Sequence, residues 1–158
     1  MRDWWRRALS EWPLARVDAL PVGWAHGDYH GRNMVFVQDE MRGLFDFDAV
    51  NRGPLVFDVA YGTYMFGREA RGSTRLRDAV ARVFLDVYAG ERPLTREELA
   101  ACPMLLALSW LLQPRFYAHL QQDGVDLIPR FRRDVSMMRA VEGEMQRVVR
   151  GLTRQNLS

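Results

Sequence analysis

Residues 24–48 constrain the fold more than any other part of the sequence, because polar residues there are interspersed with short apolar runs. The apolar runs at 34–37 and 43–45 flank a polar turn at 38–42, which is the pattern of a short β-hairpin. Six polar residues lie at the outer ends of this hairpin: His26, Asp28, His30 and Asn33 before the first strand, and Asp46 and Asp48 after the second. Antiparallel strands bring such ends side by side. We therefore expect three carboxylates and one carboxamide to converge.

An acidic cluster of this kind predicts a bound cation. Like charges at close range disfavour ionisation unless a proton or a cation neutralises them. Mg²⁺ prefers oxygen ligands and is usually held by one or two carboxylates together with substrate phosphates. Asn33 and Asp46 suit this role, and Asp48 is a possible further ligand. A zinc site is disfavoured because the cluster is rich in oxygen and contains no cysteine.

The spacing of these residues indicates phosphoryl transfer. Asp28 precedes Asn33 by five positions, as the Asp and Asn of the kinase loop H-R-D-x-x-x-x-N do, and His26 takes the place of its histidine. In that loop the aspartate accepts the proton of the attacking hydroxyl. Asp46-Phe47-Asp48 matches the magnesium-binding D-F-G in its first two positions and departs from it at the third.

The sequence resembles the aminoglycoside phosphotransferase and choline kinase-like family in three ordered segments: His26-Gly27-Asp28-Tyr29-His30-Gly31-Arg32-Asn33, then Asp46-Phe47-Asp48, then Phe57-Asp58-Val59-Ala60. The resemblance implies a protein-kinase-like fold and a small-molecule kinase that uses ATP and Mg²⁺. It implies that Asp28 is the catalytic base and that Asn33 and Asp46 bind Mg²⁺. Asp58 would brace the catalytic loop.

Structural roles compete with these functional ones. Asp58 falls in the first turn of a helix expected at 55–66, where the helix dipole alone would favour a carboxylate. For Asp28, the structural alternative to the role of general base is an Asx-turn within its loop. We expect His26 and His30 to support the loop through packing and hydrogen bonds to its backbone, rather than to act as catalysts or metal ligands.

Composition narrows the class of protein. All 22 basic residues are arginine and the net charge is +2, with the arginines scattered along the chain. A nucleic-acid-binding protein would be expected to carry a basic stripe, so no nucleic-acid partner is predicted. No apolar run reaches the 18 residues that a membrane span needs, so no membrane partner is predicted either. Cys102 stands alone, which favours a reduced core thiol and a cytoplasmic location.

The remainder of the sequence is expected to be mostly helical. Apolar periodicity predicts helices at 2–12, 55–66, 74–89 and 99–112, and a last helix begins near Pro129. We expect the helix at 99–112 to be interrupted near Pro103 and to end near Pro114. Thr95 and Glu98 form a capping box, and residues 51–54 are expected to form a loop. The predicted fold class is α+β, mostly α, as a single domain over 1–158 with helices packed around a small hairpin that carries the catalytic loop.

Two elements of a complete kinase are missing from the sequence. It contains no glycine-rich G-x-G-x-x-G loop and no lysine, both of which hold the nucleotide phosphates in kinases. The chain is therefore similar to the C-terminal lobe alone, with the N-terminal nucleotide-binding lobe absent, and no residue is assigned to nucleotide binding.

The expected function is ATP-dependent phosphorylation of a hydroxyl on an aminoglycoside, choline, homoserine or a sugar. We expect the isolated chain to be weakly active or inactive. The alternative is a non-catalytic remnant that serves as a binding or oligomerisation module. Self-association, or docking of a separate N-terminal lobe, would then supply its partner.

Overall fold

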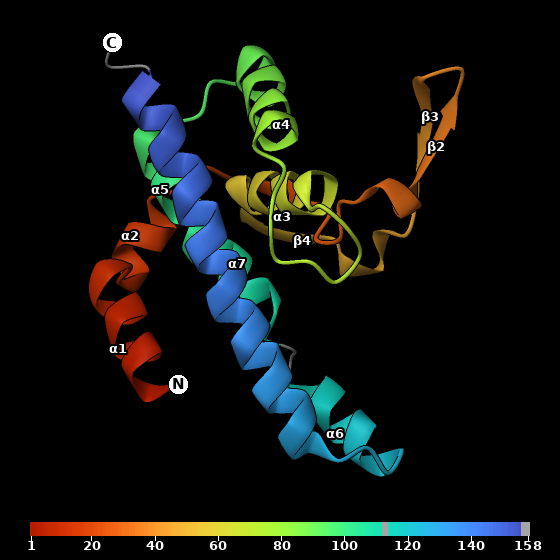
Figure 1. Cartoon of the computed structure of the whole chain (residues 1–158), viewed down its shortest axis with the longest axis vertical. Helices are drawn as coiled ribbons and strands as arrows, with labels where there is room; N and C mark the ends of the chain where they lie inside the picture. Colours follow the sequence, from red (N-terminus) through yellow and green to blue (C-terminus); the bar gives the residue numbers. More distant parts are fainter. Residues whose placement is uncertain (112–113, 156–158) are drawn as a thin grey trace.

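The computed structural model describes residues 1–111 and 114–155, which form helices around one core and a hairpin that extends from it (Figure 1). The elements follow in the order α1 (Arg2–Glu11), α2 (Leu14–Asp18), β1 (Val22–Ala25), η1 (Gly31–Asn33), β2 (Met34–Val37), β3 (Glu40–Leu44), η2 (Phe47–Ala49), β4 (Asn51–Pro54), α3 (Val56–Gly67), α4 (Asp78–Glu91), α5 (Arg96–Ser109), α6 (Pro114–Gln122) and α7 (Leu127–Gln155). Helix α7 runs along the body, and the β2–β3 hairpin projects on the side opposite α1 (Figure 1).

The main core is built where α3, α5 and α7 pack together. Helix α3 is apolar on nearly every side, so it is buried by its neighbours rather than forming one face of the surface. The fully or almost fully buried side chains at this junction are Val56, Val59, Ala60 and Tyr64 of α3, Ala101, Cys102 and Leu106 of α5, and Val141 and Met145 of α7. Close packing on several sides makes α3 a rigid base for the polar residues in its first two turns.

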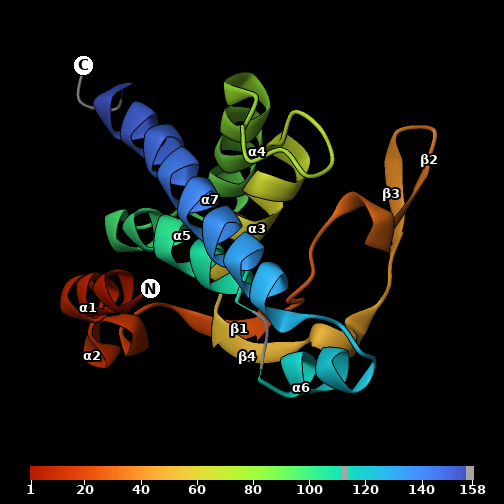
Figure 2. The ribbon, with the colours of Figure 1, turned by 60° about the horizontal axis from the view of Figure 1, so that its bottom comes forward.

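Strand β1 is paired with β4 in an antiparallel ladder that extends from Val22↔Pro54 to Ala25↔Asn51. Figure 2 shows the two strands lying together below α3. The expectation of a loop at 51–54 is therefore wrong. Its Gly-Pro pair is typical of turns, but Pro54 stands at the end of a strand with a single partner, where a missing N–H is tolerated.

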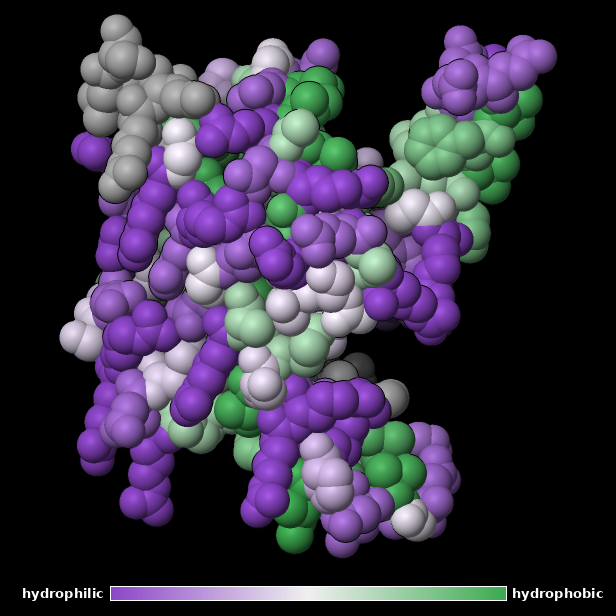
Figure 3. Space-filling view, viewed as in Figure 1, coloured by the Kyte–Doolittle hydropathy of each residue, from purple (hydrophilic) through white to green (hydrophobic). Residues whose placement is uncertain are grey.

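The β2–β3 hairpin was expected, and its turn is tighter than the sequence suggests. Gln38 and Asp39 both have positive φ and form a two-residue turn. Strand β3 therefore begins at Glu40 rather than at residue 43, where the second apolar run begins. The pairing shifts by one position between Val35 and Phe36. Most apolar side chains of the hairpin are about half exposed, which Figure 3 shows as a green arm with a hydrophilic tip.

Helix α4 begins later than its apolar pattern predicts. Instead of starting at 74, it starts at Asp78, because the preceding residues are extended. Leu76 forms an isolated bridge with Arg68, and its backbone N–H donates to the Glu144 side chain at 2.8 Å. Tertiary contacts with α3 and α7 therefore displace the first turn that periodicity alone would allow.

Helix α5 is continuous through Pro103, so the interruption expected there is wrong. A proline inside a helix removes one hydrogen bond and costs about 3 kcal/mol. Pro103 is buried, and neighbouring residues of α5 lie in the core, so packing on α3 and α7 offsets that cost. Pro114 begins α6, while Leu112, the expected last residue of the core helix, lies outside the described residues.

The predicted α+β, mostly α fold class is confirmed, although the helices pack around α3 and leave the hairpin projecting. Within the described residues, no helix combines the length and the apolar character needed to cross a membrane.

The start of α5 is fixed by a capping box that also holds a buried charge. The Thr95 hydroxyl accepts from the Glu98 N–H at 3.1 Å, and the Glu98 carboxylate accepts from the Thr95 N–H at 3.0 Å. Glu98 is fully buried and is paired with the Arg92 guanidinium. Burial alone would raise the pKa of Glu98, but the hydrogen bonds from Arg92 and Thr95 lower it below its usual value.

We predict that Glu98→Gln lowers the free energy of unfolding by about 2 to 3 kcal/mol at pH 7, because Arg92 loses its buried partner. A lowered native pKa stabilises the fold above the unfolded-state pKa, which is about 4.3 for glutamate, and this stabilisation is lost as the pH falls further. Urea unfolding should therefore show the difference between the two proteins shrinking below about pH 4.

The control is Glu97→Gln at the neighbouring position. Glu97 is exposed and pairs with Arg16 at the surface, so its loss should cost less than about 1 kcal/mol. An equal loss in both variants would show that the buried pair contributes nothing specific.

Candidate active site

The loop of residues 26–33 lies between β1 and β2, directly above the first turns of α3. Strand β1 delivers the chain to His26, and η1 returns it to the hairpin. Because β4 pairs with β1 and leads into α3, the loop is held beside the N-terminal end of that helix. Sequence and topology thus place the polar residues of the loop over those of α3.

Asp58 ties the loop to α3 through two hydrogen bonds. Its Oδ1 accepts from the Gly27 N–H at 2.9 Å, and its Oδ2 accepts from the His26 N–H. Gly27 has a φ of +81°, and a Cβ added there would lie 2.4 Å from the Ala49 carbonyl oxygen. Only glycine therefore suits this position. The contacts are those of a brace, which is the role that the resemblance implied for Asp58.

Asp28 presents a partly exposed carboxylate held by donors from two elements. Tyr61 of α3 donates its hydroxyl to Oδ1 at 2.9 Å. Asn33 donates its amide to Oδ2 at 3.2 Å and also to the Asp28 carbonyl at 3.0 Å. The Asp28 side chain keeps 36% of its surface exposed, so an incoming group can reach it. The structure therefore brings Asp28 and Asn33 together, as their spacing predicted.

Tyr61 was not identified from the sequence. It lies one turn after Asp58 on α3, so the two side chains emerge on neighbouring parts of the helix surface. Burial, followed by the hydrogen bond to Asp28, raises the pKa of the Tyr61 hydroxyl well above its usual value. The available signal was its position three residues after Asp58, which places both side chains on neighbouring parts of one helix surface.

His26 connects the loop to the end of the hairpin. Its Nδ1 accepts from the Asp28 N–H at 3.3 Å, and its Nε2 lies 3.0 Å from the Phe45 carbonyl oxygen. These partners assign the neutral tautomer with the proton on Nε2. The ring is buried, so it acts on the geometry of the loop through backbone contacts.

His30 lies beneath the loop with only 7% of its surface exposed. Its Nε2 is 3.4 Å from Asp28 Oδ2, and its buried Nδ1 has no hydrogen-bond partner in the part of the chain that the structure describes. Nε2 is thus the ring nitrogen of His30 that faces the Asp28 carboxylate.

Asp46 and Asp48 lie at the other end of the hairpin, and both are exposed. The Phe45 N–H donates to the Asn33 carbonyl at 3.0 Å, so the backbone entering Asp46 runs beside Asn33. Asp46 has a φ of +64°, a strained conformation of the kind found at functional sites. Among the described residues no three Asp, Glu, His or Cys side chains are grouped as metal ligands. The expected convergence of three carboxylates is therefore not found in the described part of the chain, where Asp46 and Asp48 are exposed and Asp28 is partly buried.

The side chains expected to bind a metal still offer oxygen ligands that suit Mg²⁺. The Asn33 amide nitrogen faces Asp28, which turns its carboxamide oxygen away from that carboxylate. This oxygen and the Asp46 carboxylate are hard oxygen ligands. The metal roles of Asn33, Asp46 and Asp48 stay predictions.

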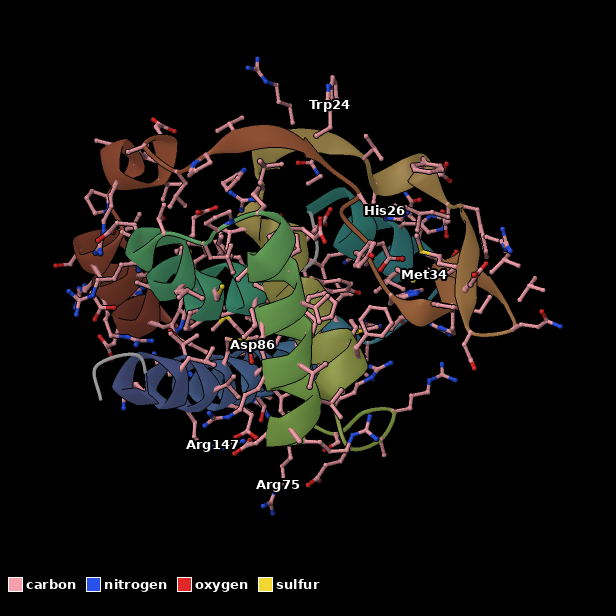
Figure 4. All side chains as sticks on the ribbon, turned by 90° about the horizontal axis from the view of Figure 1, so that it is seen from above. Trp24, His26, Met34, Arg75, Asp86 and Arg147 are labelled. Carbon is pink, nitrogen blue, oxygen red and sulfur yellow. The ribbon has the colours of Figure 1, made fainter. Side chains whose placement is uncertain are left out.

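The structure also contains an apolar groove of about 650 Å³, and Asp58 is one of the residues that line it. The other lining residues include Trp24 of β1, Val59 and Phe66 of α3, and Val83 and Val87 of α4. Trp24 is 74% exposed and points away from the body (Figure 4). The sequence predicted the apolar face of α4 but not this groove.

Comparison with known proteins agrees with the geometry of the loop. Residues 1–94 match the sequence profile described as the Phosphotransferase enzyme family, and this range contains the loop, the hairpin and the brace. The chain belongs to this family. The family resemblance that was inferred from the three sequence segments is therefore confirmed.

Several relatives of this phosphotransferase-family chain are named homoserine kinases. The chain is 40% identical to one from Bradyrhizobium sp. over 54% of its own length and 26% of the relative. It is 37% identical to one from Afipia carboxidovorans over 71% of the chain and 35% of the relative. It is 29% identical to one from Rhizobium etli over 78% of the chain and 40% of the relative. The chain thus spans less than half the length of these relatives.

We predict that Asp58→Asn loosens the phosphotransferase loop. An amide keeps one acceptor oxygen, but its NH₂ group faces a backbone N–H, which should lower the free energy of unfolding by about 2 kcal/mol. Hydrogen exchange measured by NMR should accelerate at the amides of His26 and Gly27 more than elsewhere.

Asp48→Asn provides the matched control, because Asp48 is exposed and has no hydrogen bond to the loop among the described contacts. Its loop amides should exchange as in the unmodified chain. Equal acceleration in both variants would contradict the bracing role of Asp58.

Proposed function

We propose that the polypeptide containing this chain transfers the γ-phosphoryl group of ATP to a hydroxyl of a small molecule, with Asp28 as the general base. The observation that supports this most is the Asp28 carboxylate itself. It is partly exposed and is held between Tyr61 and Asn33 in a loop of kinase spacing. Membership of the phosphotransferase family supports the same reaction type.

In the proposed reaction, the acceptor hydroxyl gives its proton to Asp28 as its oxygen forms a bond to the γ-phosphorus. The bond from that phosphorus to the β–γ bridging oxygen breaks, and ADP leaves with the electron pair. Such transition states are loose, so positioning and charge stabilisation contribute more than proton removal. The braced loop supplies the positioning through Asp58, and the Asn33 hydrogen bond fixes the carboxylate.

Mg²⁺ would be held by Asn33 and Asp46, with Asp48 as a possible further ligand. When bound, it supplies positive charge beside the phosphate oxygens of the nucleotide. The strained backbone at Asp46 is consistent with a residue kept for such a role. A cytoplasmic location is part of this proposal, because the single cysteine, Cys102, is fully buried and is a free thiol.

Homoserine is the acceptor that the relatives suggest, and we include it in the proposal. The three relatives described above each align with more than half of this chain and carry the name homoserine kinase. Choline, aminoglycosides and sugars are the other acceptors to test. All share a primary or secondary hydroxyl that a general base can approach.

We predict that Asp28→Asn lowers kcat by roughly 10²- to 10⁴-fold, because general-base catalysis typically contributes that much. The KM for the acceptor should change little. The assay uses the longest natural polypeptide that contains these 158 residues, with MgATP and each acceptor in turn, and measures ADP release.

Asp39→Asn is the control, since Asp39 lies exposed in the hairpin turn and has a positive φ that asparagine also adopts. Its kcat should match the unmodified protein. The proposal fails if no acceptor is phosphorylated, or if Asp28→Asn leaves turnover intact.

We predict that the 158-residue chain alone binds MgATP weakly and has little kinase activity. It has no lysine and no glycine-rich loop to hold the phosphates that complete magnesium coordination. Positioning of reactants can supply roughly 7 to 11 kcal/mol of a barrier, so its loss should outweigh the contribution of Asp28. Titration calorimetry checks this, and binding at micromolar or lower concentration would show that the chain contains a nucleotide site that we have not identified.

A non-catalytic binding module is the second candidate, and one observation favours it. Apolar side chains of the hairpin, including Phe36 and Val37, are about half exposed, as is expected of a surface that contacts another protein. Sedimentation at increasing concentration tests self-association. A monomer at all concentrations would count against that role while leaving the phosphotransferase proposal unaffected.

A further inference from the structure

Hydrogen-bond donors approach the two oxygens of the Asp28 carboxylate unequally. Oδ2 lies 3.2 Å from the Asn33 amide nitrogen and 3.4 Å from His30 Nε2. Oδ1 accepts from the Tyr61 hydroxyl at 2.9 Å, its only contact among the described residues. Each carboxylate oxygen offers about two lone-pair positions to donors. Two side-chain nitrogens thus lie near Oδ2, whereas the Tyr61 hydroxyl is the one hydrogen-bond donor to Oδ1 among the described residues.

We propose that Tyr61 is a positioning residue that holds the Asp28 carboxylate so that Oδ1 is the atom that receives the acceptor's proton. This inference rests on the proposed phosphotransferase function and assigns an atom and a supporting residue within that site. Tyr61 acts through Asp28 and does not contact the acceptor, which approaches Oδ1 from the side that Tyr61 does not occupy.

Tyr61 is well placed to hold a side chain still. It belongs to α3, whose neighbouring residues Val59, Ala60 and Tyr64 are buried in the core. Its ring is stacked on Phe57 at a centroid distance of 6.3 Å and an interplanar angle of 5°. Burial and the Asp28 contact raise the pKa of its hydroxyl, so it remains a protonated donor throughout the pH range of an enzyme assay.

Two residues of α3 hold different parts of the loop. Asp58 fixes the loop backbone at His26 and Gly27, and Tyr61, one turn later, fixes the side chain of Asp28. The terminal torsion of an aspartate is broad, so the carboxylate can rotate when a donor is removed. Loss of the Tyr61 hydroxyl would leave the loop in place while allowing Oδ1 to turn away from the acceptor.

The kinetic test is Tyr61→Phe in the same natural polypeptide as above, which removes the hydroxyl and keeps the ring. We expect kcat to fall about tenfold, equivalent to about 1.4 kcal/mol. The KM values of acceptor and nucleotide should stay within about twofold, because the lost interaction acts on the reacting atoms rather than on binding.

Tyr64→Phe is the matched control. Tyr64 lies on the same helix, is buried, and donates its hydroxyl to the Ser73 carbonyl at 2.7 Å, away from the loop. It should lose stability but keep its kcat. The inference is overturned if folded Tyr61→Phe keeps its kcat, or if Tyr64→Phe loses as much.

A second measurement works without turnover. The 158-residue chain, labelled with ¹³C at the ring carbon bonded to the hydroxyl, gives signals from five tyrosines, and Tyr61→Phe identifies the one that belongs to Tyr61. Asp28→Asn should displace this signal more than any other, whereas Asp39→Asn should leave it in place. An unmoved signal shows that the contact is absent and overturns the inference.

The two measurements separate this inference from the proposed function. If neither the unmodified protein nor Asp28→Asn phosphorylates any acceptor, the proposed function fails, and the assignment of Oδ1 as a base fails with it. If Asp28→Asn abolishes turnover and Tyr61→Phe does not lower kcat, the function stands and only the role of Tyr61 is overturned.

Discussion

The two hydrogen bonds that the Asp58 carboxylate accepts from the backbone N–H groups of His26 and Gly27 are the interaction on which the site depends. A loop with a positive φ at Gly27 has no regular secondary structure to hold its shape, so its backbone donors need a fixed acceptor. A carboxylate in the first turn of α3 supplies it. That helix is in turn held by α5 and α7, so the position of Asp28 is determined by packing in the core as much as by the loop sequence.

Hydrogen bonds between side chains and the backbone link the parts of the site. His26 connects the Asp28 N–H to the Phe45 carbonyl through its two ring nitrogens. The carboxylate of Asp28 accepts hydrogen bonds from an amide and a phenol, and a ring nitrogen of His30 lies 3.4 Å from it.

Predictions from the sequence were correct where the interacting residues lie within one short segment of the chain. Two apolar runs predicted the hairpin, and the five-residue spacing placed Asn33 beside Asp28, because one short loop contains both. Tyr61 escaped notice because its contact with Asp28 depends on how the loop lies across α3, which no periodicity encodes. Strand β4 was missed for a similar reason: residues 51–54 have turn composition and become a strand only because β1 is there to pair with them. The expected grouping of Asp46 and Asp48 with Asp28 is not found among the described residues, because the position of side chains at two loop ends depends on backbone angles such as the positive φ of Asp46, which the sequence does not specify.

The β1–β4 ladder has a consequence for the architecture between its strands. Ala25 and Asn51 are paired, so residues 26–50 form one long connection whose two ends are held together by the β1–β4 ladder. The turn at Gln38 and Asp39 lies at the tip of the projecting hairpin, away from the β1–β4 ladder (Figure 1). Extra residues inserted at the turn would lengthen the free end while the span from the ladder to Asp28 stayed the same. The molecule therefore separates a segment whose length is fixed by chemistry from one whose length is free to vary.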